Sequence, residues 1–331
     1  MKLRGAIVGF GAVAAEGHLP GWATRPEVQI VAICDPVAAR RHHAFRILKG
    51  VRVYDDLGLM LDGERPDFVD VASPPGFHAA AARAALEAGA HVIVEKPLCL
   101  ALEEFDALAE LARIRGRVLM CVHNWKHAPA YRRAFELIAS GRLGKVREIT
   151  LERLRTGPAG GDGPGARWRR EAALGGGILI DHGWHTLYLA QWLMGGAAPT
   201  LVSARLGGNR EGGAEEEADL QLAFDGDRRA AIQLSWHAAA RRTSASIRGD
   251  RAVLELEGNA LRLTEAQASH DLSVIDAADD SYHAAWFGSL AGDFEQAIER
   301  GGGAIVATNL AESRAALAII LEARAAAGAN P

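Results

Sequence analysis

The sequence predicts a two-domain α/β protein, in which a doubly wound parallel sheet precedes an α+β domain built on a mainly antiparallel sheet. Three observations predict this fold class. The chain has 331 residues, which is too long for one ordinary hydrophobic core. Its first third alternates short apolar runs with helical segments. The remainder carries strands of alternating polarity separated by short turns. We place the boundary at residue 122, which gives domains of residues 1–122 and 123–331.

Apolar runs, several of them rich in Val and Ile, mark the strands of the first domain. Such runs are typical of parallel strands that are buried on both faces. They cover residues 3–8, 28–34, 68–72, 91–94 and 118–122. Alanine-rich helical segments lie between them at residues 36–48, 77–88 and 102–114. The connections between parallel strands should be right-handed.

The second domain should begin with a helix over residues 129–140 and a strand over residues 146–154. A stretch rich in Gly and Pro at residues 157–165 predicts a mobile loop within this domain. A helix should then run from the glycines at 175–177 to residue 194. Further strands are predicted at residues 201–206, 219–224, 230–236, 244–248 and 252–257. Two helices, at residues 287–300 and 309–327, close the chain, and we expect the last one to pack back on the first domain.

Composition excludes several classes of protein. Apolar residues make up 49% and charged residues 24%, as in ordinary globular domains. The formal charge of −4 argues against a nucleic-acid-binding surface, which needs clustered cations. No run reaches the ~18 apolar residues of a membrane span. Cys34, Cys99 and Cys121 lack metal-type spacing, so we expect reduced thiols and a cytoplasmic protein.

A glycine loop follows the first predicted strand directly. Its G-x-G-x-x-A pattern is formed by Gly9, Phe10, Gly11, Ala12, Val13 and Ala14. The first glycine allows a tight turn, the second lets backbone approach a pyrophosphate, and the alanine lets helix and strand pack closely. The second strand ends in Asp35, about 20 residues further on, where a carboxylate can accept ribose hydroxyls. This order predicts a Rossmann domain that binds a dinucleotide.

Asp35 also bears on the choice of cofactor. Its charge would repel an added 2′-phosphate, so NAD is favoured and NADP is less favoured. Arg40 and Arg41 lie one turn further on and could offset that repulsion. A structural explanation stays open as well, since Asp35 could cap the helix that begins near Pro36.

Two further segments carry residue types suited to catalysis. Glu95, Lys96 and Pro97 follow the strand at residues 91–94, at the sheet edge where doubly wound folds bind ligands. The run from Gly175 to His185 reads GGGILIDHGWH, and on a helix Asp181 and His185 would share one face.

These patterns make the chain resemble the glucose–fructose oxidoreductase, inositol dehydrogenase and MocA-like (Gfo/Idh/MocA) oxidoreductase family. The resemblance extends over nearly the whole length. It takes in the glycine loop, the E-K-P tripeptide and the GGG…D…H run, together with Ser73, Pro74 and His78 and the closing helices. It implies a nicotinamide-dependent oxidoreductase with an NAD(P)-binding domain and a substrate-binding, oligomerisation domain.

The resemblance also implies roles for individual residues. Lys96 corresponds to the lysine between nicotinamide and substrate, His185 to the histidine that exchanges a proton with the reacting hydroxyl, and Asp181 to its carboxylate companion. Oxidising an alcohol requires a base for the hydroxyl proton, and a histidine with a pKa near 6.5 suits this step. A fixed ammonium stabilises the developing alkoxide. Cofactor contacts are implied for Ser73, Pro74, His78, Glu95, Lys96 and Asn124.

The sequence departs from the family pattern on the substrate side. Many relatives carry aspartate three residues after the histidine, where this chain has Tyr188. The usual arginine-bearing segment appears here as His123-Asn124-Trp125-Lys126. These changes put substrate specificity in doubt more than redox chemistry.

Some of these residues have structural explanations that the sequence leaves open. Lys96 could be a surface partner of Glu95. His185 could be a core histidine, and His182 lies on another helix face and either supports the fold or reaches the substrate. His123 and His127 have the i,i+4 spacing of metal ligands without a convincing third ligand, so we predict no metal site.

Three further predictions concern packing and surface. The run at residues 215–217 is interpreted as a solvated turn. Trp236 and Trp286 are interpreted as packing residues.

Arginines flank the glycine-rich loop. They are Arg153, Arg155, Arg167, Arg169 and Arg170. Trp168 and Arg169 could fold over the pocket as part of a lid, and Arg169 could clamp an acidic group of the substrate. Alternatively, most of these arginines are solvated or bind Glu152 and Glu171.

The leading hypothesis is an NAD-dependent dehydrogenase or ketone reductase that acts on a sugar, cyclitol or similar polyol. One alternative is an enzyme that uses tightly bound NAD transiently, of glycosidase or lyase type. Another is a non-catalytic NAD-binding regulatory protein. As in many relatives, we expect a homo-oligomer, either a dimer or a tetramer.

Overall fold

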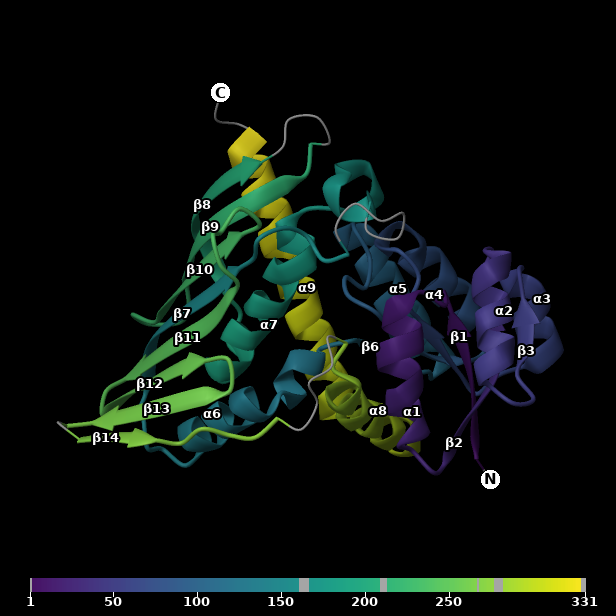
Figure 1. Ribbon diagram of the computed structural model, residues 1–331, viewed down its shortest axis with the longest axis horizontal. Coiled ribbons are helices and arrows are strands. Elements are labelled where there is room, and N and C mark those ends of the chain that lie inside the picture. The colour runs from purple at the N-terminus through teal and green to yellow at the C-terminus, as the bar shows by residue number, and fades with distance from the viewer. Residues whose placement is uncertain (1, 161–166, 209–212, 267, 277–281, 329–331) are drawn as a thin grey trace. The chain divides into compact units, whose positions relative to one another are not determined.

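The chain divides into two compact units in the computed structural model, which describes residues 2–160, 167–208, 213–266, 268–276 and 282–328 (Figure 1). Unit 1 comprises Met1–Asn124 and Ala278–Arg314, and unit 2 comprises Trp125–Ala277 and Ala315–Pro331. Unit 1 therefore includes a segment near the C-terminus that a single division at residue 122 assigns to the second domain. The loop predicted at residues 157–165 falls largely on residues 161–166, which lie outside the described part of the chain.

The first unit is built on a six-stranded parallel sheet with the strand order β3-β2-β1-β4-β5-β6. The strands are β1 (Leu3–Val8), β2 (Val28–Cys34), β3 (Arg52–Tyr54), β4 (Phe68–Val71), β5 (His91–Val94) and β6 (Leu119–Cys121). The predicted Rossmann sheet is confirmed. Strand β3 was not predicted, because three residues are too few to show a pattern.

Helices connect these strands. They are η1 (Val13–His18), α1 (Leu19–Ala23), α2 (Ala38–Ile47), α3 (Leu57–Glu64), α4 (His78–Glu87) and α5 (Leu102–Arg115), with a short 3₁₀ turn η2 (Pro75–Phe77) before α4. Helix α3 was not predicted, because two glycines in eight residues lower its helix propensity. The side chain of Asp56 caps α3 by accepting a hydrogen bond from the Leu59 N–H at 2.8 Å.

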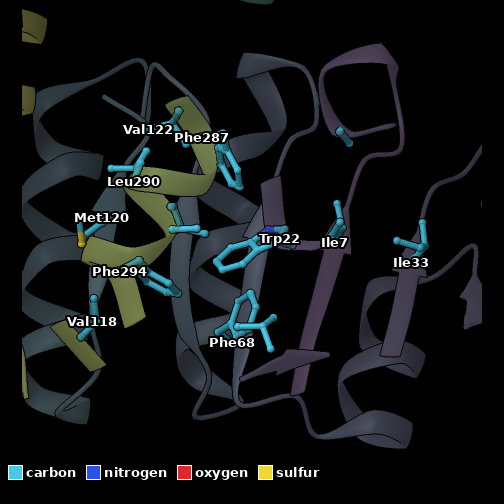
Figure 2. Packing of buried hydrophobic residues seen from close by; sticks show 14 of the residues in the cluster. Ile7, Trp22, Ile33, Phe68, Val118, Met120, Val122, Phe287, Leu290 and Phe294 are labelled. Atoms are coloured by element: carbon cyan, nitrogen blue, oxygen red, sulfur yellow. The ribbon is translucent and has the colours of Figure 1, made fainter. Parts of the chain in front are cut away.

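Helix α8 (Ala284–Glu299) belongs to unit 1 because its apolar face completes the core of the parallel sheet (Figure 2). The rings of Trp22 and Phe68 lie 4.7 Å apart, and those of Phe68 and Phe294 lie 5.7 Å apart. Phe287 and Leu290 come from the same face of α8 and are buried. Aromatic side chains of this size dominate the apolar area that a core removes from water.

The first turns of α9 (Ala304–Gly328) cover the edge of the parallel sheet. Asn309 accepts the Cys121 N–H at 2.8 Å and donates its amide N–H to the Cys121 carbonyl at 2.9 Å. One side-chain amide thus pairs both backbone groups of Cys121, which an edge strand would otherwise expose. Residues Ala304–Ala327 are also long and apolar enough to cross a membrane by length and composition alone, a property that buried helices of globular proteins share.

The second unit is built on an eight-stranded sheet with the order β14-β13-β12-β11-β7-β10-β9-β8. The strands are β7 (Val146–Leu154), β8 (Thr200–Gly208), β9 (Glu215–Ala223), β10 (Arg229–Ser235), β11 (Arg242–Gly249), β12 (Ala252–Glu257), β13 (Ala260–Glu265) and β14 (Ala268–Asp271). Strands β7 and β10 are parallel and the other described pairs are antiparallel, so the predicted mainly antiparallel sheet is confirmed. Strands β13 and β14 were not predicted.

The helices of unit 2 include α6 (Pro129–Ala139), the π-helical turn η6 (Leu179–Gly183) and α7 (Trp184–Leu193). Short 3₁₀ turns η3 (Asn124–His127), η4 (Arg167–Arg170) and η5 (Ala172–Leu174) occupy the connections. Trp236 in this unit and Trp286 in unit 1 are both buried, as expected of packing residues.

The prediction of a solvated turn at residues 215–217 is wrong. Glu215 begins β9 and is buried. Its carboxylate accepts hydrogen bonds from Arg324 at 2.8 Å and from the Leu179 N–H at 3.2 Å. A buried carboxylate needs such partners, and both lie far from Glu215 in the sequence. Local composition therefore could not reveal them.

Candidate functional site

The glycine loop of unit 1 has the conformation that its sequence requires. Gly9 has a φ of +86°, and a Cβ there would lie 2.6 Å from the Ser73 nitrogen. A Cβ on Gly11 would meet nothing within 4 Å, so open space lies over this residue. Ala14 is completely buried where the helix meets the sheet. The loop is shaped to let a ligand approach the backbone closely.

Asp35 fixes this loop against the end of β2. Its buried carboxylate accepts the Phe10 N–H at 2.7 Å and the Val37 N–H at 2.8 Å. The second bond goes to the N-cap residue of α2, and no side chain caps the first turn of this helix, so the capping role that the sequence left open for Asp35 is not borne out. Arg40 lies 3.4 Å from the carboxylate. Oδ2 accepts from both Phe10 and Arg40, whereas Oδ1 accepts the Val37 N–H and has a second acceptor position to which a hydroxyl could bind.

Two buried polar atoms lie in the segments that follow β4 and β6. Ser73 Oγ and Asn124 Oδ1 are both buried without a hydrogen-bond partner among the described residues. Such atoms are costly unless a ligand or water completes them. Pro74 is exposed beside Ser73.

His78 has protein partners on both sides. Its ring nitrogens lie 2.6 Å from the Ser73 carbonyl oxygen and 2.6 Å from the Pro97 carbonyl oxygen. Burial lowers the pKa of His78. The imidazole therefore ties the loop after β4 to the segment after β5, where the Lys96–Pro97 peptide bond is cis.

A chain of buried polar groups leads from the core to Lys96. Asp70 is completely buried in the apolar strand β4 and lies 3.0 Å from His18 Nδ1. The other ring nitrogen of His18 lies 3.1 Å from Glu95 Oε1. The second oxygen of Glu95 accepts the Lys96 main-chain N–H at 2.9 Å. Trp22 completes the network by donating its indole N–H to Asp70 at 2.8 Å.

The charges in this network reinforce one another. Burial alone would lower the pKa of His18, but the charges and hydrogen bonds of Asp70 and Glu95 outweigh it and raise the pKa to about 9. Burial also opposes ionisation of Glu95, yet its contacts with His18 and Lys96 hold its pKa below the ordinary value. At neutral pH the imidazole is therefore a cation between two carboxylates. Sequence reasoning missed His18, although a carboxylate inside an apolar strand is a signal that a buried partner exists.

His185 in unit 2 has different surroundings. Its Nδ1 lies 2.8 Å from the hydroxyl of Tyr188, which accepts the Trp125 main-chain N–H at 3.1 Å. The rings of Trp125 and His185 lie 5.4 Å apart. A hydroxyl both donates and accepts, so it can bind either tautomer of the imidazole.

Asp181 lies in the turn η6 just before α7. Its Oδ1 accepts the Arg169 Nε–H at 3.2 Å, and its Oδ2 lies 3.7 Å from His182 Nε2. Asp181 belongs to a π-helical turn, and His185 follows it in the first turn of α7. Arg169 also lies over the ring of Trp168 at 4.6 Å. The predicted substrate-side residues thus form two small groups within this unit.

Two arginines, Arg153 in β7 and Arg155 directly after it, are buried, which the sequence did not reveal. Arg153 bonds the Glu152 carbonyl at 2.8 Å and the Tyr131 hydroxyl, and its guanidinium lies 4.7 Å from the Trp125 ring. Arg155 donates to the Leu154 and Arg242 carbonyls at 2.8 and 2.9 Å. Burial, together with the charges of Arg241 and Arg153, lowers the pKa of Arg155 to about 10.

The predicted site residues fall into both units. The loop residues Gly9 to Ala14, Asp35, Arg40, Ser73, Pro74, His78, Glu95, Lys96 and Asn124 belong to unit 1. Trp168, Arg169, Asp181, His182, His185 and Tyr188 belong to unit 2. His123, weighed as a metal ligand, lies 3.3 Å from Glu312 and 3.2 Å from Ser313. No group of three His, Cys, Asp or Glu side chains suited to a metal ion occurs in the described part of the chain.

The sequence is similar to those of oxidoreductases that act on sugars. D-glucoside 3-dehydrogenase of Escherichia coli (strain K12) is 35% identical over 202 residues, which are 61% of this chain and 57% of that protein. A dTDP-3,4-didehydro-2,6-dideoxy-alpha-D-glucose 3-reductase of Streptomyces violaceoruber is 31% identical over 193 residues, which are 58% of this chain and 55% of that protein. The matched part thus spans little more than half the length of these relatives.

Among solved structures, an inositol dehydrogenase homolog from Azotobacter vinelandii complexed with NAD+ superimposes with a TM-score of 0.85. It is 24% identical and is matched over 100% of this chain and 96% of its own. An oxidoreductase from Agrobacterium radiobacter in complex with NAD+, L-tartaric acid and magnesium gives a TM-score of 0.86 at 21% identity, over 100% of this chain and 98% of its own. These likenesses confirm the fold.

The family comparison covers both units. The model of an oxidoreductase family with an NAD-binding Rossmann fold matches residues 3–123, and the model of the GFO/IDH/MocA C-terminal domain matches residues 131–255. Together with the sequence relatives, these matches show that the chain belongs to the Gfo/Idh/MocA oxidoreductase family.

Proposed function

We propose that this protein is an NAD-dependent dehydrogenase or ketone reductase that acts on a hydroxyl or keto group of a sugar, cyclitol or related polyol. The observation that carries the proposal is the arrangement in unit 1. A glycine loop with open space over Gly11 and a lysine held at its backbone by Glu95 lie at the carboxyl ends of one parallel sheet. Ligands bind at this edge in doubly wound folds. The names of the relatives support the substrate class.

The residues of unit 1 fit a nicotinamide dinucleotide. The glycine loop would hold the pyrophosphate, and Asp35 would accept the adenosine ribose hydroxyls. The unpartnered Ser73 Oγ and Asn124 Oδ1 are suited to hydroxyl or amide groups of a ligand. When bound, such a cofactor supplies the hydride acceptor or donor for the reaction.

Lys96 and His185 are assigned the chemical roles. The ammonium of Lys96 would hold the substrate oxygen and stabilise the charge that develops on it. His185 would exchange the hydroxyl proton through Nε2. The tautomer that donates from Nδ1 to Tyr188 presents Nε2 as an acceptor for alcohol oxidation. The imidazolium form donates this proton in the reverse direction.

The substrate is proposed to carry an acidic group. Arg153 and Arg155 are both buried, Arg153 lies over the ring of Trp125, which is a neighbour of His185, and the charge of Arg153 contributes to the lowered pKa of Arg155. An anionic substrate group would offset this concentration of positive charge. Arg169 already binds Asp181, so its clamping role requires that it exchange that partner for the substrate. Trp168, His182 and Tyr188 are further proposed substrate neighbours.

NAD is proposed over NADP because the Asp35 carboxylate is directed at the loop and would repel a 2′-phosphate. Fluorescence titration with NADH and NADPH tests this preference, with about tenfold tighter NADH binding expected from one unfavourable charge contact of about 1.4 kcal/mol. Tighter binding of NADPH would instead identify Arg40 and Arg41 as phosphate ligands. Solved relatives contain NAD or NADP, so the titration is needed.

A panel of neutral polyols, sugar acids and keto sugars tests the function as a whole. Cofactor that copurifies is assayed first, and the reaction is followed by NADH absorbance. Net formation or consumption of NADH with the parent protein, and its loss in Lys96→Ala, supports the dehydrogenase. Product formation without net NADH supports an enzyme that uses bound NAD transiently. Cofactor binding with no turnover of any panel member supports a regulatory protein.

A homo-oligomer, either a dimer or a tetramer, and a cytoplasmic location complete the proposal. Light scattering on the purified protein measures the oligomeric mass directly. A monomer at assay concentration would contradict this part of the proposal without affecting the proposed chemistry.

A further inference from the structure

Asp70 is a carboxylate in a buried and apolar environment, where such a group is stable only when it binds a partner. It occupies the centre of β4, whose other residues are apolar, and its side chain is completely buried. The sheet surrounds it on both sides, since β1 and β5 pair with β4. An ionised carboxylate in such a place requires a close positive partner. His18 and the indole N–H of Trp22 supply the contacts.

The imidazole of His18 lies between two carboxylates and contacts both of them. Both oxygens of Asp70 lie 3.0 Å from Nδ1, and Glu95 Oε1 lies 3.1 Å from Nε2. Only an imidazole protonated on both nitrogens donates in both directions at once. The ring is also stacked on Phe287, with centroids 3.8 Å apart and planes inclined by 13°. The two carboxylates and the stacked Phe287 ring together fix the orientation of the imidazole.

Glu95 passes this constraint to the residue that follows it. One oxygen is held by His18 and the other accepts the Lys96 N–H at 2.9 Å. The carboxylate therefore has one orientation while His18 is protonated. If His18 were neutral, one of its two nitrogens would face a carboxylate without a proton between them, and the repulsion would turn one carboxylate away.

We propose that His18 is a positioning residue, a buried imidazolium that locks Glu95 and through it the backbone that presents Lys96 to the substrate. The inference rests on the proposed role of Lys96. It adds three residues, His18, Asp70 and Glu95, that act together as a support for the reacting ammonium. Misplacement of a reacting group by about 1 Å costs on the order of 100-fold in rate, so such a support has a measurable effect.

The charged and titratable groups around the bridge come from several elements. Asp70 faces His18 from β4, and Glu95 with Lys96 faces it from the segment after β5. Helices α1 and α8 contribute the non-ionising rings of Trp22 and Phe287. Around Glu95, His78 on α4 and Cys121 on β6 lie within electrostatic reach. Burial lowers the pKa of His78 and raises that of the Cys121 thiol, whereas its two carboxylate partners raise the pKa of His18 to about 9.

The proposal has a specific signature in the Asp70→Asn variant. Removing the Asp70 charge removes the largest influence that holds the proton on His18, so His18 should deprotonate at a lower pH. The variant should keep kcat near that of the parent at pH 6.5 and lose about 10- to 100-fold by pH 8.5, where the parent keeps most of its activity. A residue with a merely structural role would lower kcat equally at both pH values.

Trp22→Phe is the matched control. It deletes the other hydrogen bond to Asp70 from the same core but leaves the carboxylate charge and the His18 bridge in place. Its stability should fall, while its kcat and the shape of its pH profile should match those of the parent. A second variant, His18→Gln, should lower kcat by about 10- to 100-fold at pH 7 with NADH affinity within threefold of the parent.

Nitrogen-15 NMR of the histidine side chains measures the protonation of His18 without any substrate. His18 should show protons on both ring nitrogens up to about pH 8 in the parent, and on one nitrogen at that pH in Asp70→Asn. A neutral His18 in the parent at pH 7 would overturn the proposal. So would a kcat of His18→Gln within twofold of the parent at every pH.

Failure of the proposed function would be recognised separately. Activity that survives in Lys96→Ala shows that Lys96 has another role, and it overturns the proposed function together with the support inferred for it. Activity that needs Lys96 but ignores His18 and Asp70 overturns this inference alone. Should Asp70→Asn prove too unstable to purify, His18→Gln/Asp70→Asn removes both charges of the pair, and it should fold while keeping the low kcat of His18→Gln.

Discussion

Two buried histidines, His18 in unit 1 and His185 in unit 2, have opposite surroundings. His18 lies between the carboxylates of Asp70 and Glu95, which favour the imidazolium and raise its pKa to about 9. His185 binds the hydroxyl of Tyr188 and lies near the ring of Trp125. A hydroxyl favours neither protonation state strongly. The comparison teaches that partners decide what a buried histidine can do: two carboxylates favour the imidazolium form of His18, whereas a hydroxyl is compatible with the proton exchange that we propose for His185.

The comparison predicts its largest effect for His185→Ala. General acid–base catalysis contributes about 10²–10⁴-fold, so kcat should fall by that factor, against about 10- to 100-fold for His18→Gln. NADH affinity should stay near that of the parent, because the proposed cofactor residues lie in unit 1. Steady-state kinetics with the best panel substrate and NADH titration measure both quantities.

Thr186→Ser is the control for this variant. Thr186 is the adjacent buried residue on α7, and its hydroxyl bonds the Gly183 carbonyl at 2.9 Å, a contact that serine retains. Its kcat should match that of the parent. A His185→Ala enzyme within a few-fold of the parent would remove His185 from the chemistry and break the comparison.

The next effect concerns stability and pH. The pKa of His18 rises from 6.5 to about 9 on folding, so its contribution to stability is fully present below pH 6.5 and is lost as the pH rises through 9. The contribution amounts to about 3 kcal/mol. The difference in unfolding free energy between the parent and His18→Gln should therefore shrink between pH 6.5 and pH 9.5. Urea unfolding at both pH values measures this difference.

Comparing the parent with the variant at both pH values cancels the contributions of groups that titrate equally in the two proteins. His185→Ala provides the contrast, because His185 Nδ1 binds the hydroxyl of Tyr188, whereas His18 binds the carboxylates of Asp70 and Glu95. The stability of His185→Ala relative to the parent should depend less on pH over the same range. An equal pH dependence for both variants would show that the two histidines do not differ as proposed.

Features that act through the backbone could be predicted from the sequence. Gly9 and Gly11 are required by the shape of the loop, and Asp35 follows them at the expected distance. The parallel order of the first sheet follows from the alternation of strands and helices. These features depend on residues close together in the sequence or on a repeated pattern, and either can be recognised without knowing the contacts.

Side-chain partnerships between distant residues could not be predicted. Asp70 and His18 are 52 residues apart, and Glu215 and Arg324 are 109 apart. No feature of the neighbouring sequence indicates either pair, and the composition around Glu215 favoured the wrong prediction of a solvated turn. Each miss reflects tertiary contact overriding a local rule.

The smallest effect is predicted for Tyr188→Phe, and it gives the most selective test of the comparison. The phenyl ring fills the same buried space, so the change removes the hydroxyl alone. That hydroxyl binds His185 Nδ1 and accepts the Trp125 N–H. Losing one such hydrogen bond costs about 1 kcal/mol, which corresponds to about a fivefold loss of kcat if the bond orients the imidazole.

The dependence of kcat on pH distinguishes a variant in unit 2, Tyr188→Phe, from a variant in unit 1, Asp70→Asn. Because a hydroxyl carries no charge at neutral pH, Tyr188→Phe should lower kcat at all pH values and leave the pH limbs close to those of the parent. Asp70→Asn should do the reverse, keeping kcat at low pH and moving the alkaline limb. A large displacement of the acid limb in Tyr188→Phe would show that Tyr188 controls the protonation of His185. In that event the two histidines would both be held by their partners, and the distinction between a positioning and a proton-exchanging imidazole would fail.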